Sequence, residues 1–150
     1  MIGTLRALDP DDRLAIHESV RRIATNVAES MGATAEVQIP LSTSYPVTYN
    51  DPELTAQMVP VLEAVAGADQ VQLTPAQTGA EDFAFFAERV PGFYIRLGGR
   101  PADVAEEDAS DHHTPDFYID DSGLGLGARA MTAMALHYMN THGPAAGSEP

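Results

Sequence analysis

Apolar residues recur at intervals of three and four along three stretches of the chain, the spacing of helices with one buried face. Two of these stretches open on the same signal, Asp9-Pro10 and Asp51-Pro52, in which a capping side chain precedes a proline suited to the first helical turn. Pro60 inside the second stretch predicts a kink. The helices expected are Asp9 to Gly32, Asn50 onward, a short one from Glu81 to Arg89, and Ser122 to Thr141. The residues expected to face inward are Ile16, Val20, Ile23, Val27 and Met31 in the first helix, Leu54, Met58, Val61, Leu62 and Val65 in the second, and Leu124, Ala128, Met131, Ala135 and Tyr138 in the last.

The segments between these helices have the patterns of β-strands. Apolar residues alternate with polar ones from Ala35 to Ile39, as in a half-buried strand. The other strands expected are residues 3–7, 44–49, 71–73 and 93–97. The order is then β-α-β-β over residues 1–50 and α-β-α-β-α over residues 51–143, with a flexible tail at 144–150. We therefore expect an α/β protein, made of an α+β piece and an α/β piece, with a mixed sheet covered by helices.

Composition narrows the class of protein. The chain of 150 residues is 44% hydrophobic, but no apolar run approaches the roughly 18 residues of a membrane span. Its N-terminus lacks the basic and apolar blocks of a signal peptide, so the sequence predicts a cytoplasmic protein without a membrane partner. A net charge of −14 argues against nucleic acid as a partner, because its phosphates would be repelled. With no cysteine in the chain, a metal site must use His, Asp and Glu side chains.

The adjacent histidines His112 and His113 are the first candidates for chemistry. Neighbouring side chains in extended backbone point to opposite faces, so the two imidazoles are not expected to serve one metal ion. Pro115 favours extended geometry at Thr114, which would hold the preceding histidine on a stiff segment. Surface histidines without a function are common, and the residues alone leave that alternative open.

Charged groups at two further places suit ligand binding. Glu81 and Asp82 begin the short helix, where acids also stabilise the helix dipole without any further role. Arg6 has a guanidinium that can bind a carboxylate through two hydrogen bonds, although an exposed arginine at a strand end needs no function. The glycines at 123, 125 and 127 lack the spacing of a dinucleotide-binding loop, and we interpret them as sites of close helix packing.

Five segments, taken in order, resemble the co-catalytic metallopeptidases and amidohydrolases that include aminoacylases, hippurate hydrolases and hydrolases of indole-acetic-acid–amino-acid conjugates. The segments are Gly3-Thr4-Leu5-Arg6, Gly79-Ala80-Glu81-Asp82-Phe83, residues 92–99, His113-Thr114-Pro115-Asp116-Phe117, and Asp120-Asp121 before the last helix. The resemblance covers nearly the whole chain. It implies that residues 1–50 are part of a lid and dimerisation domain, and that residues 51–143 are the C-terminal part of a catalytic domain.

The resemblance also implies roles for individual residues. His113, and not His112, would be the last ligand of a dimetal centre that holds Zn or Mn. Glu81 or Asp82 would lie at the rim of the substrate site, in the same cleft as His113, and Arg6 would meet the carboxylate end of the substrate. The resemblance assigns no catalytic residue to this chain, because the family places its general base and most metal ligands before the lid. It further implies a homodimer, formed through the lid piece.

Two hypotheses from different classes follow. In the first, the chain is the C-terminal fragment of a metal-dependent amidohydrolase that cleaves the amide of N-acyl amino acids or related peptides, and it is inactive alone. In the alternative, it is a non-catalytic folded or dimerising module, or a truncated relic without metal chemistry. A neighbouring reading frame that encodes the missing ligands would favour the first hypothesis.

Overall fold

The computed structural model of the chain describes residues 1–143, and the tail predicted at 144–150 lies outside them. The chain forms two compact units. The first comprises Met1–Asp51 and Thr74–Tyr94, and the second comprises Pro52–Leu73 and the chain from Ile95 onward. The first break thus falls next to the boundary expected at residue 50, but residues 74–94 return to the first unit. The predicted assignment of 1–50 and 51–143 to two domains of the family stays a prediction.

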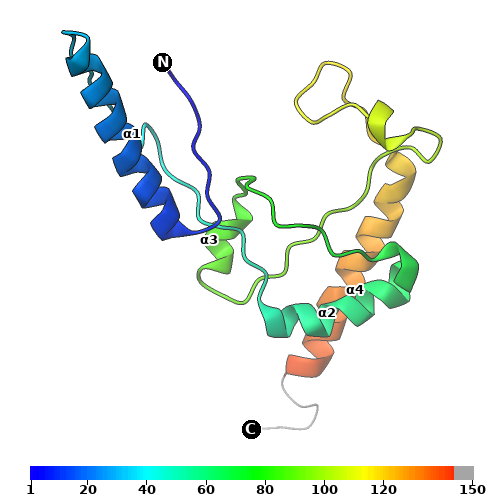
Figure 1. The fold of residues 1–150 in the computed structure, drawn as a ribbon. Helices are drawn as coiled ribbons and strands as arrows, with labels where there is room; N and C mark the ends of the chain where they lie inside the picture. The colour runs from blue at the N-terminus through cyan, green and yellow to red at the C-terminus, as the bar shows by residue number, and fades with distance from the viewer. Residues whose placement is uncertain (144–150) are drawn as a thin grey trace, which may run out of the picture. The chain divides into compact units, whose positions relative to one another are not determined.

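Helices form where the apolar spacing and the caps predict them. Residues 1–143 contain four α-helices and three single-turn 3-10 helices (Figure 1). Their bounds are α1 Pro10–Ser30, α2 Pro52–Ala66, η1 Ala68–Gln70, α3 Phe83–Ala87, η2 Glu106–Asp108, η3 Asp121–Gly123 and α4 Leu124–His142. Helix α2 continues through Pro60. The four predicted helices are therefore confirmed, with α3 shorter than expected.

Both ends of α1 are fixed by the residues that the sequence indicates. The Asp9 carboxylate accepts hydrogen bonds from the backbone N–H groups of Asp11 at 2.7 Å and Asp12 at 3.1 Å. Such a cap stabilises a helix by about 1 kcal/mol. Gly32 has a φ of 71°, a left-handed conformation that glycine adopts without steric cost and that ends helices. The predicted limits of this helix are confirmed.

The part of the chain that the structure describes contains no β-strand, so the predicted α/β class with a mixed sheet is wrong. The predicted strand segments lie in irregular backbone. The backbone hydrogen bonds near them are isolated: Asp51 N donates to Gly92 O at 2.9 Å, and Asp120 N to Gly99 O at 2.7 Å. A strand needs a ladder of such bonds to a partner, whereas alternating apolar residues specify only an extended, half-buried segment. The residue pattern therefore does not establish pairing.

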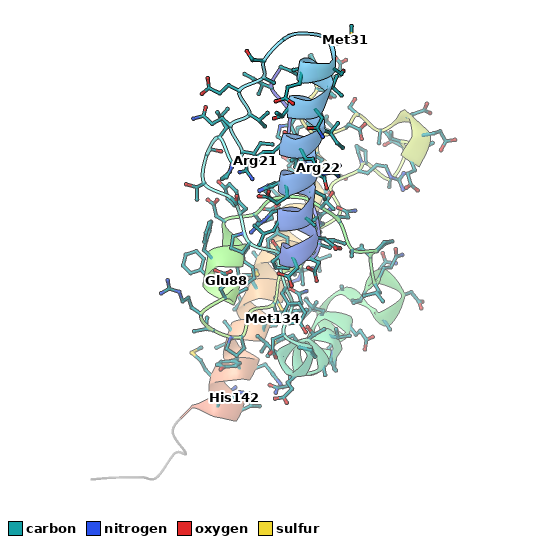
Figure 2. All side chains as sticks on the ribbon, turned by 60° about the vertical axis from the view of Figure 1, so that its left-hand side comes forward. Arg21, Arg22, Met31, Glu88, Met134 and His142 are labelled. Atoms are coloured by element: carbon teal, nitrogen blue, oxygen red, sulfur yellow. The ribbon has the colours of Figure 1, made fainter. Side chains whose placement is uncertain are left out.

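Helix α1 contacts the chain that follows it through polar groups. Its Arg13 donates to the carbonyl oxygen of Tyr45 at 2.9 Å, and Arg21 donates to that of Ile39. His17 lies between these arginines at a spacing of four residues and is buried. Figure 2 shows Arg21 partway along α1. Backbone carbonyl groups of the irregular segment after the helix thus accept hydrogen bonds from the polar face of α1.

The apolar stripe of α1 that the spacing predicts to face inward is mostly exposed to solvent. Ile23 is 53% exposed, Val27 is 58% exposed, and Met31, at the end of the helix in Figure 2, is 81% exposed. The expectation that this stripe covers one face of a small sheet is wrong, because residues 1–50 form no sheet. Within the first unit, the C-terminal half of this apolar face is therefore largely exposed.

A small cluster of aromatic and polar contacts joins α3 to the segments around residues 50 and 92–94 of the first unit. The Phe83 ring lies 5.5 Å from that of Tyr94, measured between centroids. The Asn50 side chain donates to Tyr94 O at 2.9 Å and accepts from Tyr94 N at 2.7 Å. Gly92 is buried, and a Cβ at this position would lie 2.9 Å from Cζ of Phe83. Only glycine lets the ring pack this close to the backbone.

In the second unit, α2 packs against α4 (Figure 1). Met58 and Leu62 of α2 are buried, as expected, and so are Ala130 and Met134 of α4. The prediction of which face of α4 is buried is wrong, because Leu124, Met131 and Tyr138 from the predicted stripe are exposed. Both faces of α4 are apolar, and α2 covers the one that contains Met134.

Candidate functional site

His113 lies in a tight turn of the second unit. Its φ is 66°, and it is the non-glycine residue with positive φ among those described. The Thr114 hydroxyl donates to Asp111 O at 2.7 Å, and Phe117 N donates to Thr114 O at 3.2 Å. These bonds fold the segment back on itself. The expectation of extended backbone at the two histidines is therefore wrong, and so is the argument from it that they diverge.

The two imidazoles have different neighbours. The His112 ring lies 4.8 Å from the Phe117 ring between centroids, at an interplanar angle of 40°. The rings of His112 and His113 are 6.5 Å apart. Both histidines are exposed. Strained backbone is found disproportionately at functional sites, and His113 is the strained residue of the pair. Its role as a metal ligand stays a prediction that rests on the family resemblance.

A cavity of about 520 Å³ opens beside this turn. His112 lines it, together with residues 97–101, Val104, residues 108–110, residues 117–120 and Leu124. His113 is not among the lining residues. Cavities of this volume commonly hold small ligands. The geometry of the second unit thus places an aromatic pair and a cavity next to the segment that resembles the metal-ligand motif.

The carboxylate of Asp120 is held at the entrance to η3. It accepts a hydrogen bond from the backbone N–H of Ser122 at 2.9 Å. This backbone bond, and after it a hydrogen bond from the Ser122 side chain, lowers the pKa of Asp120 below its usual value, and slight desolvation opposes the shift. Asp120 therefore stays negatively charged at neutral pH beside the cavity that it lines.

We expect Asp120 to titrate at lower pH in the folded chain than in the unfolded chain. Its contribution to stability is then fully present above the unfolded pKa and is lost as the pH falls through the folded pKa. A carbon-detected NMR titration of its side chain measures the folded value. Ser122→Ala removes the side-chain hydrogen bond and should raise the pKa part of the way, since the backbone bond remains. A midpoint equal to that of the unfolded chain would contradict this account.

The other predicted site residues belong to the first unit. Arg6 is exposed in irregular backbone before α1. Asp82 is exposed and lies at the start of α3, where its side chain makes no capping hydrogen bond, and Glu81 is half-buried. The second unit contains His113, and the relative placement of the two units is not determined. The predicted common cleft of His113 and residues 79–82 therefore stays a prediction, as do the roles of Arg6, Glu81 and Asp82.

The described residues do not form a metal site by themselves. No group of three or more His, Asp and Glu side chains in residues 1–143 is arranged to hold a metal ion. A catalytic zinc site takes three protein ligands and an open position. Any metal bound through His113 would need ligands from elsewhere, so we derive no chemical step through a metal from these residues. The same part of the chain has no helix long and apolar enough to cross a bilayer.

Comparisons with known proteins establish the family. The model of peptidase family M20/M25/M40 matches residues 1–137. Thermostable carboxypeptidase 2 of Saccharolobus solfataricus is 34% identical over 140 residues, which are 93% of this chain and 34% of the relative. IAA-amino acid hydrolase ILR1-like 6 of Arabidopsis thaliana is 30% identical over 140 residues, 92% of this chain and 30% of the relative. N-acetyldiaminopimelate deacetylase of Streptococcus suis is 33% identical over 96 residues, 64% of this chain and 25% of the relative.

The chain belongs to peptidase family M20/M25/M40, which confirms the resemblance seen in the sequence. It spans about a third of the length of the relatives that it matches over most of its residues.

The sequence singled out some residues that line the cavity, among them His112, Phe117 and Asp120, but not those from Arg100 to Ser110. Arg100 and Val104 lie in an acidic, aperiodic segment that predicts only a loop. One signal is visible in hindsight: Phe117, Tyr118 and Ile119 form an apolar run directly after the histidines. A run of apolar side chains on an irregular segment indicates packing or a binding surface, because apolar groups exposed to water are unfavourable in a solvated loop.

Proposed function

We propose that this chain forms part of a metal-dependent hydrolase that cleaves the amide bond of N-acyl amino acids or related peptides. Family membership along residues 1–137 supports the proposal most strongly. The names of its relatives describe a carboxypeptidase, a hydrolase of IAA-amino acids and a deacetylase of N-acetyldiaminopimelate. These activities share the hydrolysis of an amide next to an amino acid, and this shared chemistry defines the substrate class that we propose.

The proposal includes inactivity of the 150-residue chain alone. The described residues lack a complete ligand set, and a single imidazole neither holds Zn or Mn tightly nor activates water. Within the proposal, His113 supplies one ligand, while Glu81, Asp82 and Arg6 contact the substrate. The remaining ligands and the general base come from the two thirds of the family fold that this chain does not span. A cytoplasmic location stays a prediction.

The exposed apolar face of α4 supports the proposal that further residues of the family fold pack against this chain. Leu124 is 55% exposed and Met131 61% exposed, although both belong to an apolar stripe with a helical spacing. A helix that is apolar on two faces is usually buried on both. Within the second unit, the face that contains Met134 packs on α2, whereas Leu124 and Met131 on the other face stay largely exposed.

A chimera tests the proposed function. In it, this chain replaces the matching 140 residues of thermostable carboxypeptidase 2. We expect the chimera to hydrolyse N-acetyl or N-benzoyl amino acids in a reaction that a chelator stops, and the isolated chain to hydrolyse neither. The unmodified carboxypeptidase is the positive control. A folded, metal-loaded chimera without turnover would favour the non-catalytic alternative, and chelator-sensitive turnover by the isolated chain would contradict its inactivity.

We further propose that the chain forms a homodimer through its first unit. Residues 1–50 contain no strand, so pairing between the strand edges of two chains does not support this dimer. The uncovered stripe of α1, which includes Ile23, Val27 and Met31, supports it instead, because exposed apolar patches commonly mark interfaces.

Val27→Asp is expected to convert the dimer to a monomer, since it places a charge in the middle of the stripe. Asn26→Asp introduces the same charge at the neighbouring exposed position of α1 and should leave the dimer intact. Sedimentation equilibrium of the two variants measures the difference. A monomeric parent chain at high concentration would refute the dimer.

A further inference from the structure

Helix α1 contains a buried ionisable side chain that the proposed hydrolase chemistry does not use. His17 is 9% exposed, and it is the only buried polar residue among residues 1–143. Arg13 precedes it by four residues and Arg21 follows it by four, so the three side chains share one face of the helix. No ion pair joins His17 to another residue of this described part of the chain.

The two arginines attach one irregular segment of the first unit to this face. Arg13 donates through Nη1 to the carbonyl oxygen of Tyr45 at 2.9 Å, and Arg21 donates through Nη2 to that of Ile39. Residues 39–45 contain no acidic or basic side chain, and Tyr45 is their one titratable group. The segment is thus fixed to α1 at both of its ends, on either side of His17 along the helix.

A proton on His17 would place a third positive charge between Arg13 and Arg21. Like charges four residues apart on a helix repel each other, and a buried charge without a partner is costly. The neutral imidazole avoids both effects. The neutral form of His17 is therefore the one that suits the attached segment.

The acids of α1 itself are poorly placed to compensate for such a charge. Glu18 is the nearest in sequence, but its side chain is 77% exposed and pairs with Arg21 at 2.6 Å. Asp9 caps the helix, and Asp11 and Asp12 lie in its first turn. These three acids precede His17 by at least five residues, which is about 7.5 Å along the helix axis.

The other segments of the first unit add little negative charge at this face. Residues 33–49 contain one acid, Glu36, which is exposed and precedes the contact at Ile39. Residues 1–8 contain Arg6 and the terminal amine, both positive. Helix α3 reaches the segment through Phe85, whose ring lies 5.6 Å from that of Tyr45, and α3 has no charged residue. The acids that flank α3, Asp82 and Glu88, are exposed.

We propose that His17 acts as an acid-sensitive latch, which holds residues 39–45 on α1 while it is neutral and releases them when it is protonated. Release exposes the imidazole to water, where a histidine takes up a proton below about pH 6.5. Attachment is therefore strongest above this pH and weakens below it, by up to about tenfold per pH unit for one proton. The latch requires neither a metal nor turnover, so its failure would leave the proposed hydrolase function untouched.

Distances between two spin labels test the latch on the 150-residue chain. The chain has no cysteine, so Asn26→Cys on α1 and Thr43→Cys on the segment, both at exposed positions, take up the labels specifically. Pulsed electron paramagnetic resonance is measured at pH 7.5 and pH 5.0 in about 0.15 M salt, which screens distant charges. Dilution with unlabelled chain restricts the signal to distances within one chain. The ratio of detached to attached chain should rise about 10- to 30-fold between the two pH values.

Variants of the histidine separate its charge from the other acid-sensitive groups. His17→Gln is neutral at both pH values and should keep the short distance at pH 5.0. His17→Lys is charged at both and should give the detached distances already at pH 7.5. His142→Gln changes an exposed histidine of the second unit and should leave the pH response unchanged.

The same distances at both pH values in the parent chain, or the parent's response in folded His17→Gln, would overturn the proposal. Where a variant fails to fold, side-chain NMR of His17 in the parent chain decides the question. Detachment should follow protonation of the His17 ring across the titration. Detachment that proceeds while the ring stays neutral would equally overturn the latch.

Discussion

Replacing His113 by alanine in the carboxypeptidase chimera should abolish metal-dependent hydrolysis, with a loss of more than about 100-fold in kcat/KM. Loss of a residue that merely supports a metal ligand costs 10- to 100-fold in metal affinity or activity, and loss of a ligand should cost at least as much. The metal content of the purified variant should fall together with its activity. Steady-state kinetics and elemental analysis of the same preparation measure both quantities.

The neighbouring histidine provides the decisive comparison. His112 packs on Phe117 and lines the cavity, so His112→Ala should keep the metal and change mainly KM. His142→Ala, near the C-terminal end of α4 in Figure 2, should change neither metal content nor kinetics. If His112→Ala lost the metal while His113→Ala kept it, the ligand assignment would be reversed, although the family would stand.

Replacing Met134 by alanine should lower the free energy of unfolding by about 2–5 kcal/mol. Met134 is 9% exposed on the face of α4 that packs against α2, where Met58 is 3% exposed. Few residues of the described chain are buried, so little other apolar contact compensates for the cavity that alanine leaves. Urea unfolding followed by circular dichroism measures the change.

Met131 supplies the matched control on the same helix. It is 61% exposed, so Met131→Ala should change the free energy of unfolding by less than about 0.5 kcal/mol. Equal effects of the two substitutions would show that α4 does not pack on α2 through the Met134 face. In the chimera, where we propose that further chain covers the Met131 face, Met131→Ala should become destabilising.

The helices could be predicted from sequence because their signals are local. The Asp9 cap, the prolines at 10 and 52, and Gly32 act within one turn of each helix end, and the structure uses them as expected. Strands could not be predicted in this way. An alternating segment such as residues 35–39 becomes a strand only beside a partner, and no partner lies among residues 1–143.

The buried face of α4 could not be chosen from sequence for a related reason. Leu124, Met131 and Tyr138 form one apolar stripe, and Ala130 and Met134 belong to another. Periodicity shows that a stripe exists but does not show which one meets a given neighbour. In the structure the stripe that contains Ala130 and Met134 is the buried one, because α2 packs against α4 there.

The candidate site could be predicted only in part. The motif from His113 to Phe117 leads correctly to the family. It does not reveal the turn at His113, since a left-handed φ in a histidine depends on the surrounding hydrogen bonds. The cavity at Arg100 and Phe117 arises from contacts between segments that are distant in sequence, and no local pattern encodes it.

We propose that this chain supplies one metal ligand, His113, to a site completed by the rest of the family fold. Titration of Zn²⁺ into the chimera and into the isolated chain, followed by calorimetry under identical conditions, tests it most directly. The account predicts tight binding to the chimera that His113→Ala removes, and weak or undetectable binding to the isolated chain. Tight binding of Zn²⁺ by the isolated 150-residue chain, or by the chimera without His113, would contradict it.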